Sequence, residues 1–325
     1  MLSTQAHASL LQIPTHLPPF LRRHRPPKQN VVVVMGATGT GKSKLAVDLA
    51  AGRHHPAEII NSDKMQVYEG LDIVTNKITP EECLGIPHHL IGIADSDSDF
   101  TAADFAATSS LAVESISEKG KLPIIAGGSN SFIEALIDGR NHEFRSRYDV
   151  CFLWVDVAMP VLHRAVSLRV DRMVAAGMVE EVRQKFDLNS SYSRGIRQAI
   201  GVPEFDSFFR SEFYNSDRKT RAKLLESAIN ETKVNTCKLA CKQLRKIHRL
   251  RNVNGWKIHR LDATKVFEKT GSEADEAWRE LVAEPGSAIV ARFIHGLDHS
   301  WAATSDSGWS VREAERRTAM VAAAR

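Results

Sequence analysis

Long apolar runs are missing from this chain, and cysteine is scarce. No run approaches the ~18 apolar residues that a membrane-spanning helix needs, so we expect no membrane partner. The four cysteines, at positions 83, 151, 237 and 241, give no disulfide framework and favour a reducing compartment. Cys237 and Cys241 precede His248 and His259, but these spacings differ from those of a zinc finger. Two small buried residues on a helix are the favoured interpretation of this cysteine pair.

Acidic residues are absent from the first 30 positions, which contain four Lys or Arg and five prolines. The prolines disfavour a folded segment. Acid-poor N-termini that contain arginine are typical of organelle transit peptides. We therefore expect residues 1–30 to be a transit peptide, with a disordered tail that carries no address as the alternative.

The rest of the chain has the composition of a globular protein, with 43% hydrophobic and 25% charged residues. Five apolar runs predict strands, and helical patterns separate most of them. These runs are 31–35, 58–61, 89–93, 122–126 and 151–155. Alternating strands and helices predict an α/β fold, with a parallel sheet flanked by helices. The loops that carry chemistry should follow the carboxyl ends of the strands.

One motif, Gly36-Ala37-Thr38-Gly39-Thr40-Gly41-Lys42-Ser43, directly follows the first apolar run. It fits the phosphate-binding loop (P-loop), in which backbone N–H groups and the start of the next helix bind phosphate oxygens. Lys42 supplies a positive charge, and the Ser43 hydroxyl suits Mg²⁺. A chance glycine-rich turn is disfavoured because strand, loop and helix arrive in the required order. The motif predicts phosphate binding and leaves open whether a nucleotide is hydrolysed.

The strand and helix patterns then divide the chain. Residues 31–157 are predicted to form a P-loop NTPase-like α/β core. Residues 158–250 contain no convincing strand and predict a mostly helical insertion that forms a substrate channel. Residues 251–325 are expected to return to the core, with a strand near 256–261 and a helix over 268–283.

Positive charge is concentrated in the segment 217–251, which has eleven Lys or Arg and three acidic residues. The segment predicts a long helix or a helix pair. One stripe of that helix consists of Lys238, Lys242, Arg245 and Arg249. The excess of positive charge favours an anionic ligand (nucleotide, diphosphate or RNA) over an ordinary solvated face.

An acidic residue follows the second predicted strand, in the loop Asn61-Ser62-Asp63-Lys64-Met65-Gln66. A second glycine-rich turn, Ala126-Gly127-Gly128-Ser129-Asn130, follows the strand at 122–126. A conventional NTPase needs a carboxylate in such a place for Mg²⁺. From position alone, Asp63 could equally cap a helix, pair with Lys64 or take part in catalysis.

Six ordered motifs, within about residues 31–251, resemble the isopentenyltransferase family. They are the segments 36–43, 62–73, 87–91, 126–129, 196–201 and 236–243. The family includes tRNA dimethylallyltransferases and the adenylate isopentenyltransferases that begin cytokinin synthesis. Lys64 and Asn76 look like the plant adenylate branch, since the tRNA branch typically has Ser and Ala there. That likeness makes a plastid the expected destination of the transit peptide, with the cytoplasm as the alternative.

The resemblance implies transfer of the dimethylallyl group of dimethylallyl diphosphate to N6 of adenine in ATP or ADP, with AMP possible. The P-loop of this family binds the donor's diphosphate, so its expected ligands here are Gly36, Thr38, Gly39, Thr40, Gly41, Lys42 and Ser43. Asp63 would accept the N6 proton, and Thr75 would orient the amine. Lys42, together with Mg²⁺ on Ser43 and Thr40, would stabilise the leaving diphosphate.

The resemblance and the local charge suggest further ligands of the anionic groups. Ser129, Arg197, Lys242 and Arg245 are predicted to complete the diphosphate site. Lys219 and Lys223 are predicted to contact the phosphates of the nucleotide.

Arg169 and Arg172 share a predicted helix with Asp171, so local ion pairs are favoured over a phosphate contact there.

Three alternatives remain open. A tRNA dimethylallyltransferase would grip an anticodon loop and take in a flipped adenine. Lys64, Asn76 and the lack of an aromatic platform among the basic residues argue against that reading. A small-molecule kinase would use Asp63 as the base for a hydroxyl. A P-loop switch without catalysis would not need Asp63. We expect a monomer that acts on small molecules and does not bind tRNA.

Overall fold

The structure is a computed structural model that describes residues 28–52, 55–139 and 143–297. Residues 1–27 of the predicted transit peptide lie outside the described residues, as do positions 298–325. Gln29 and Asn30 already belong to the first strand.

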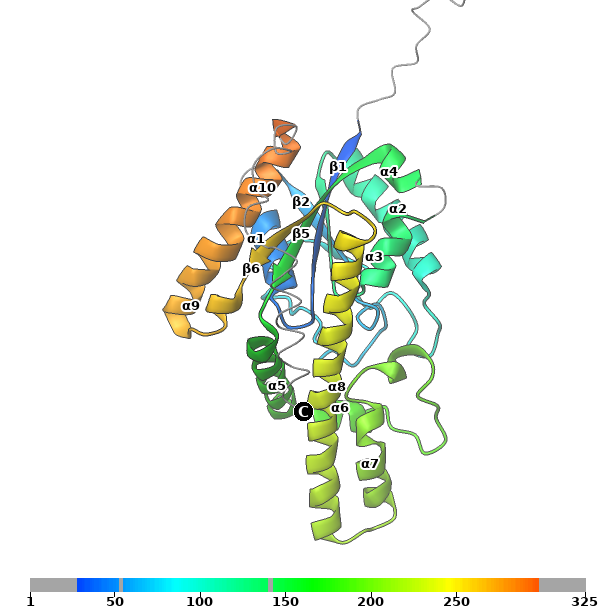
Figure 1. The fold of residues 1–325 in the computed structure, drawn as a ribbon. Coiled ribbons are helices and arrows are strands. Elements are labelled where there is room, and N and C mark those ends of the chain that lie inside the picture. The colour runs from blue at the N-terminus through cyan, green and yellow to red at the C-terminus, as the bar shows by residue number, and fades with distance from the viewer. Residues whose placement is uncertain (1–27, 53–54, 140–142, 298–325) are drawn as a thin grey trace, which may run out of the picture.

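Six parallel strands form one sheet in the order β3-β2-β4-β1-β5-β6 (Figure 1). Their bounds are β1 (Gln29–Gly36), β2 (Ala57–Asn61), β3 (His88–His89), β4 (Leu122–Ala126), β5 (Tyr148–Asp156) and β6 (Ile258–Asp262). The centre of β1 is buried on both faces, as its continuous run of valines requires in a parallel sheet. The predicted α/β fold is confirmed.

Helices cover both faces of the sheet (Figure 1). One face carries α1 (Lys42–Ala51), α9 (Gly271–Trp278) and α10 (Glu284–Ile294). The other carries α2 (Ala102–Glu118), α3 (Asn130–Ile137) and α4 (Glu143–Arg147). Alternate residues of β1 point to opposite faces, so Val32 packs in a cluster with Leu45 and Val33 in a cluster with Phe105.

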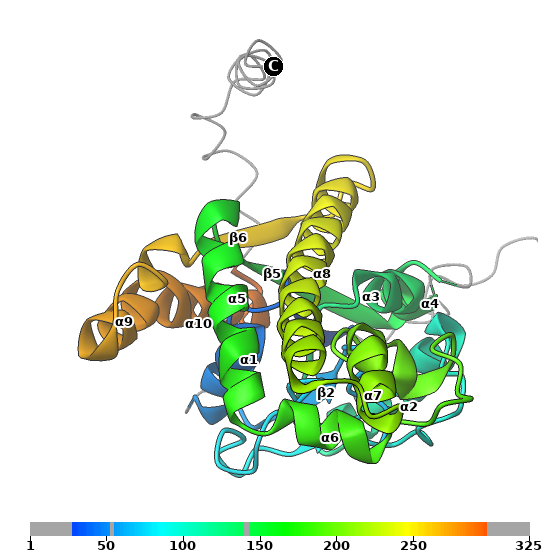
Figure 2. The same ribbon diagram turned by 90° about the horizontal axis from the view of Figure 1, so that it is seen from below.

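The segment after β5 is helical, as predicted. It contains α5 (Met159–Ala175), α6 (Met178–Gln184), α7 (Asp206–Phe213) and α8 (Arg218–Asn252), with short 3-10 turns at Gly195–Gln198 and Pro203–Phe205. The far end of α8 packs on the sheet through Ile247 and Leu250. Its first half packs against α7, and the two helices extend beyond the sheet as a hairpin (Figures 1 and 2). One helix thus connects the α/β core to the helical part.

The C-terminal part returns to the core through β6, which pairs with β5. A 3-10 turn (Thr264–Val266) leads to α9, a π-helical turn (Arg279–Ala283) and α10. The predicted helix over 268–283 therefore continues through Pro285, which lies in the first turn of α10, where proline is tolerated. Among the described residues, no helix has both the length and the apolar character needed to cross a membrane.

Candidate active site

Three loops meet at one edge of the sheet because β2, β4 and β1 are neighbours and all end there. They are the P-loop after β1, the Asp63 loop after β2 and the second glycine-rich turn after β4. These loops, together with α5 and α8, enclose a cavity of about 770 Å³. A volume of this size suits a substrate of low molecular mass.

The P-loop presents Thr38, Gly39, Gly41, Lys42 and Ser43 to the cavity. Gly39 and Gly41 have φ angles of +82° and +92°, a region that favours glycine. The ammonium group of Lys42 donates to the carbonyl oxygen of Ala37 at 2.7 Å. Burial lowers the pKa of Lys42 to about 8, although the charge of Asp63 opposes this shift. Lys42 is therefore a desolvated cation at the place where the motif predicts a phosphate.

Arg169 of α5 joins the P-loop from the other side of the cavity. Its Nη2 donates to the hydroxyl of Thr38 at 2.8 Å, while its buried Nε has no hydrogen-bond partner in the structure. Burial lowers the pKa of Arg169 below its usual value. Asp171 pairs with Lys233 of α8 at 2.5 Å, so the predicted local pairing of Arg169 is wrong. Arg169 is therefore a cation of the cavity lining, which the spacing of the charged residues in the sequence did not predict.

Asp63 is held at the cavity by its neighbours. Its backbone N–H donates to Asn61 Oδ1 at 3.1 Å, and its own Oδ1 accepts from the backbone N–H of Met65 at 3.0 Å. Asn61 is fixed in turn by donating to the carbonyl of Leu90 at 3.0 Å. Asp63 Oδ2 accepts no hydrogen bond from any residue that the structure describes. One carboxylate oxygen thus positions the side chain, and the other faces the site unpaired.

The second glycine-rich turn packs directly on the Asp63 loop. A Cβ atom on Gly127 would lie 2.1 Å from the carbonyl oxygen of Ser62, so only glycine fits there. The Ser129 hydroxyl accepts from the backbone N–H of Lys64 at 2.8 Å, and the Ser129 N–H donates to the Ser62 carbonyl at 3.0 Å. Ser129 lines the cavity as predicted, and its hydroxyl proton is not used by any described residue.

Thr75 lies on a turn that lines the cavity. Its hydroxyl donates to the carbonyl of Leu71 at 2.7 Å, which leaves the Thr75 oxygen free to accept. Glu181 of α6 braces this turn, because its two carboxylate oxygens accept from the N–H groups of Ile73 and Val74, each at 2.9 Å. No local sequence pattern identified Glu181, because its contact with Ile73 spans more than one hundred positions.

Gln243 of α8 links two of the loops. Its Oε1 accepts from the backbone N–H of Thr38 at 2.7 Å, and its Nε2 donates to the carbonyl of Gly128 at 3.0 Å. Gln243 lay within a recognised motif but was not assigned a role. Lys242, the preceding residue, lines the cavity as predicted.

The structure does not bring every predicted ligand to the cavity. The Thr40 side chain is buried and donates to the Ala37 carbonyl at 2.9 Å, so its hydroxyl stabilises the loop. Gly36 closes β1 beneath the loop and does not line the cavity. Arg197 pairs with Asp97 at 3.2 Å, donates to the Lys185 carbonyl and does not line the cavity.

Two further corrections concern α8. Arg245 lines a separate cavity between α5 and α8. Lys219 lies at the start of α8, about 20 Å along the helix from Thr232, the first α8 residue at the main cavity. Lys223 lies on the same remote stretch and also does not line that cavity. The helical spacing of the sequence predicted which residues share a face of α8. It did not predict which part of the length of α8 lies at the cavity.

The donor set near Ser43 fits Mg²⁺ better than a softer metal. Ser43 lies at the start of α1, is exposed to the cavity, and its hydroxyl has no partner among the described residues. The Asp63 carboxylate lines the same cavity. Hard oxygen donors of this kind suit Mg²⁺, which is commonly completed by substrate phosphates and water. Thr40 does not fit as a second hydroxyl ligand, since its side chain is buried and does not line the cavity.

Comparison with known proteins agrees with this geometry. The family model described as IPP transferase matches residues 66–147 and 140–249. The chain belongs to the isopentenyltransferase family. Adenylate isopentenyltransferase 5, chloroplastic, of Arabidopsis thaliana is 59% identical over 282 residues, which are 86% of this chain and 83% of that protein. Adenylate isopentenyltransferase 7, mitochondrial, of the same plant is 49% identical, with 88% of this chain and 89% of that protein covered.

Solved structures of isopentenyltransferases share the fold. A eukaryotic dimethylallyltransferase acting on tRNA superposes with a TM-score of 0.70 at 24% identity, covering 83% of this chain and 80% of that chain. The tRNA isopentenylpyrophosphate transferase of Bacillus halodurans gives a TM-score of 0.64 at 25% identity, covering 83% and 100%. The sequence identity is therefore much higher to the adenylate enzymes than to these tRNA enzymes.

Proposed function

We propose that this isopentenyltransferase transfers the dimethylallyl group of dimethylallyl diphosphate to N6 of adenine in free ATP or ADP, with AMP as a further acceptor. The observation that carries the proposal is the convergence of three groups on one cavity: the P-loop with Lys42, the unpaired oxygen of Asp63, and the hydroxyl of Thr75. The relatives named adenylate isopentenyltransferases support the choice of acceptor. The product would be the first intermediate of cytokinin synthesis.

The donor's diphosphate would lie against the P-loop. Lys42 and Arg169 approach that place from two elements, and the unpartnered Nε of Arg169 gives it a donor without a protein acceptor. Lys242 and the free proton of Ser129 lie on the same cavity. As the bond from C1 to oxygen breaks, charge builds up on the diphosphate, and preorganised donors stabilise it there.

The acceptor amine would lie between Asp63 and Thr75. An adenine amine is a weak nucleophile because its lone pair is delocalised into the ring, so it must lose a proton as its nitrogen bonds to C1. Asp63 Oδ2 has no protein donor among the described residues and can take that proton. The Thr75 oxygen can accept a hydrogen bond from the second N6–H group, because the Thr75 hydroxyl donates its own proton to the Leu71 carbonyl. The two residues together would fix the orientation of the amine.

Magnesium would be held by Ser43 and the donor's diphosphate. A bound Mg²⁺ would supply positive charge to the leaving group. The proposal predicts that chelation abolishes transfer and that added Mg²⁺ restores it.

tRNA is the main alternative to a free nucleotide as the acceptor, and one feature of the fold is a reason to test it. Phe213 and Tyr214 are exposed at the end of α7, with ring centroids 5.3 Å apart, beside the basic start of α8. The two rings meet edge to face, and they precede the basic segment 217–251, which itself contains no Phe, Trp or Tyr. Phe213 is the last residue of α7, and neither residue of the pair lines the cavity.

A competition assay tests the acceptor. Purified protein with Mg²⁺ and labelled dimethylallyl diphosphate is offered AMP, ADP, ATP and an unmodified tRNA with an accessible adenine. Label in the nucleotides alone is the expected result. Label in tRNA alone would assign the protein to the tRNA branch, and ADP formed from ATP without a prenyl donor would indicate a kinase.

The destination of the protein is also a proposal. Several relatives are named chloroplastic and one mitochondrial, which supports delivery to a plastid. A fluorescent fusion of the full chain would report the organelle directly.

A further inference from the structure

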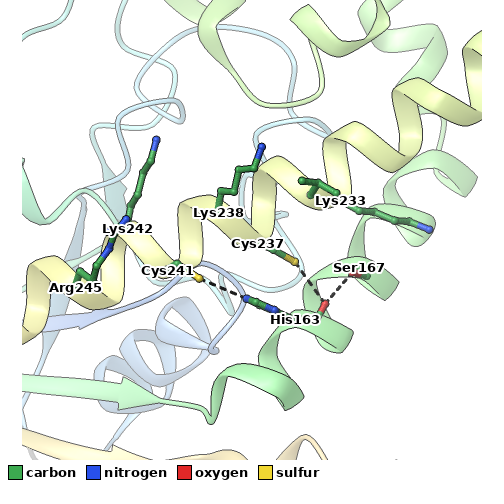
Figure 3. A pocket seen from close by; sticks show the side chains of 9 residues that line it. His163, Ser167, Lys233, Cys237, Lys238, Cys241, Lys242 and Arg245 are labelled. Atoms are coloured by element: carbon green, nitrogen blue, oxygen red, sulfur yellow. Dashed lines mark hydrogen bonds between the residues drawn. The ribbon is translucent and has the colours of Figure 1, made fainter. Parts of the chain in front are cut away.

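A second cavity, of about 400 Å³, lies between α5 and α8, outside the active site (Figure 3). Its lining contains two thiols, one imidazole and four cationic side chains, and no carboxylate. The residues that carry the argument are His163, Cys237, Cys241, Lys242 and Arg245.

The two helices bring a thiol and an imidazole together. Cys241 Sγ lies 3.6 Å from Nε2 of His163, whose side chain points from α5 toward α8 (Figure 3). Cys237 Sγ instead faces the backbone carbonyl of His163 at 3.9 Å. Cys241 is therefore the thiol with a side-chain acceptor for its proton. Thiol–disulfide exchange proceeds through the thiolate, and a neighbouring imidazole that can take the thiol proton favours that form.

The charges of this cavity favour an anionic reagent. Lys233 pairs with Asp171, and Lys238 donates to Asn235 at 3.3 Å. Lys242 and Arg245 have no ion-pair or hydrogen-bond partner among the described residues. Arg245 lies one helical turn beyond Cys241, on the same face of α8. If a small disulfide bound Arg245 through its carboxylate, a sulfur atom of the same molecule would lie beside Cys241.

We propose that Cys241 is a modification site that forms a mixed disulfide with a small anionic disulfide of the glutathione type. The Cys241 sulfur attacks one sulfur of glutathione disulfide, His163 takes the thiol proton, and the bond between the two reagent sulfurs breaks. One glutathionyl group remains on Cys241, and the other half leaves as a thiolate. A reducing thiol reverses the step.

An internal disulfide with Cys237 is the competing product, and helix geometry disfavours it. Residues four apart on a helix have Cβ atoms about 5–6 Å apart. A disulfide needs about 3.5–4.5 Å, so α8 would have to distort.

The modification would inhibit transfer through Lys242, the residue that lines both cavities. The carboxylates of the glutathionyl group would attract Lys242 and place negative charge beside the donor's diphosphate. This consequence rests on the proposed function, whereas the modification itself does not. We expect the modified protein to show a KM for dimethylallyl diphosphate raised at least about tenfold.

The experiment treats the reduced full chain with glutathione disulfide and follows the reaction by intact mass and peptide mapping. Cys83 is a matched control thiol, since burial and the neighbouring Glu82 and Glu81 raise its pKa. We expect Cys241 to react at least about ten times faster than Cys83. His163→Gln should slow the reaction at Cys241, and Cys241→Ser should abolish it, while both variants keep the transfer activity of the unmodified protein.

Dithiothreitol should remove the glutathionyl group and return the KM for dimethylallyl diphosphate to its original value. Equal labelling of Cys83, or a bond between Cys237 and Cys241, would overturn the modification. A modified protein with an unchanged donor KM would overturn its inhibitory effect. The mass measurement needs no enzymatic activity, so a failure of the proposed function would be visible separately in the untreated protein.

Discussion

The side-chain carbonyl of Gln243 accepts a hydrogen bond from the backbone N–H of Thr38, at 2.7 Å. These residues are 205 positions apart, and the contact ties the longest helix of the described chain to the phosphate-binding loop. The amide of Gln243 also donates to the carbonyl of Gly128 at 3.0 Å. Gln243 is thus a positioning residue that sets the distance between two walls of the cavity.

Gln243→Leu should loosen the donor site. The substitution leaves the Thr38 N–H and the Gly128 carbonyl unpaired, at a cost of about 1–3 kcal/mol for each group that stays buried. We expect the KM for dimethylallyl diphosphate to rise about tenfold, with a lower melting temperature. Gln184→Leu, at an exposed position of α6, is the control and should change neither quantity. A folded Gln243→Leu protein with a normal donor KM would remove this role.

Asp63→Asn should stop chemistry without preventing donor binding. Asparagine keeps an oxygen for the Met65 N–H, so the loop should hold its shape, but the amide cannot take the N6 proton. We expect turnover to fall about 10²–10⁴-fold at saturating substrates, with an unchanged donor Kd, and Asp63→Ala should behave similarly. Single-turnover kinetics and donor titration measure the two quantities.

The matched control for Asp63 is Asp149→Asn, because Asp149 is an exposed carboxylate at the second position of β5, at the opposite end of the sheet. It should have normal turnover. A weakened donor Kd with unchanged turnover in Asp63→Asn would contradict the proton-acceptor role.

Lys42 should make donor binding depend on pH in the alkaline range. Its pKa of about 8 in the free protein means that the ammonium is charged below that pH and neutral above it. Since the charged form attracts the diphosphate, donor affinity should fall as pH rises through about 8. Binding should raise this pKa and take up a proton, which calorimetry in buffers of different ionisation enthalpy detects.

Lys42→Arg separates this effect from ionisation of the donor itself, because a guanidinium stays charged throughout the range. Its donor affinity should show a weaker dependence on pH than the wild type. Lys42→Ala should weaken donor binding and turnover together. Equal pH dependence in the wild type and Lys42→Arg would assign the titration to another group.

The sequence predicted most of the sheet because its signals are local. The run 31–35 lies within β1, and the P-loop motif needed no distant contact to be recognised. The predicted strand at 89–93 is reduced to His88–His89, because Leu90 adopts a φ of +62° and leaves the sheet. Hydrophobicity alone does not report such a turn.

Contacts between distant segments were not predictable in the same way. No helix was predicted beyond residue 283, but Gly286 lies in α10 and allows that helix to approach the side chains of Leu45 and Leu261 at the sheet. Arg169 was assigned to local ion pairs, yet it reaches Thr38 across the cavity. Charge patterns predicted an anionic ligand, whereas tertiary packing decides which cationic side chains line the cavity.

Glu181 offers a test of the acceptor side of the cavity. Its carboxylate accepts from the N–H groups of Ile73 and Val74, which fixes the turn that carries Thr75. Glu181→Ala should release this turn, raise the KM for the nucleotide about tenfold and lower turnover, because two charge-assisted hydrogen bonds are lost. The donor Kd should not change, since the P-loop is untouched. This split between the two substrates distinguishes a local effect on Thr75 from general destabilisation.

Glu180→Ala is the matched control, because Glu180 is an exposed neighbour that pairs only with Arg183 among the described residues. It removes the same charge from the same helix and should leave both substrates unaffected. Glu181→Gln should fall between the wild type and Glu181→Ala, since an amide retains one acceptor oxygen for the two N–H groups. Steady-state kinetics with ATP varied at saturating dimethylallyl diphosphate ranks the three variants. An equal rise of both KM values in Glu181→Ala would show that the turn does more than orient the acceptor, and the assignment of Thr75 would then fall.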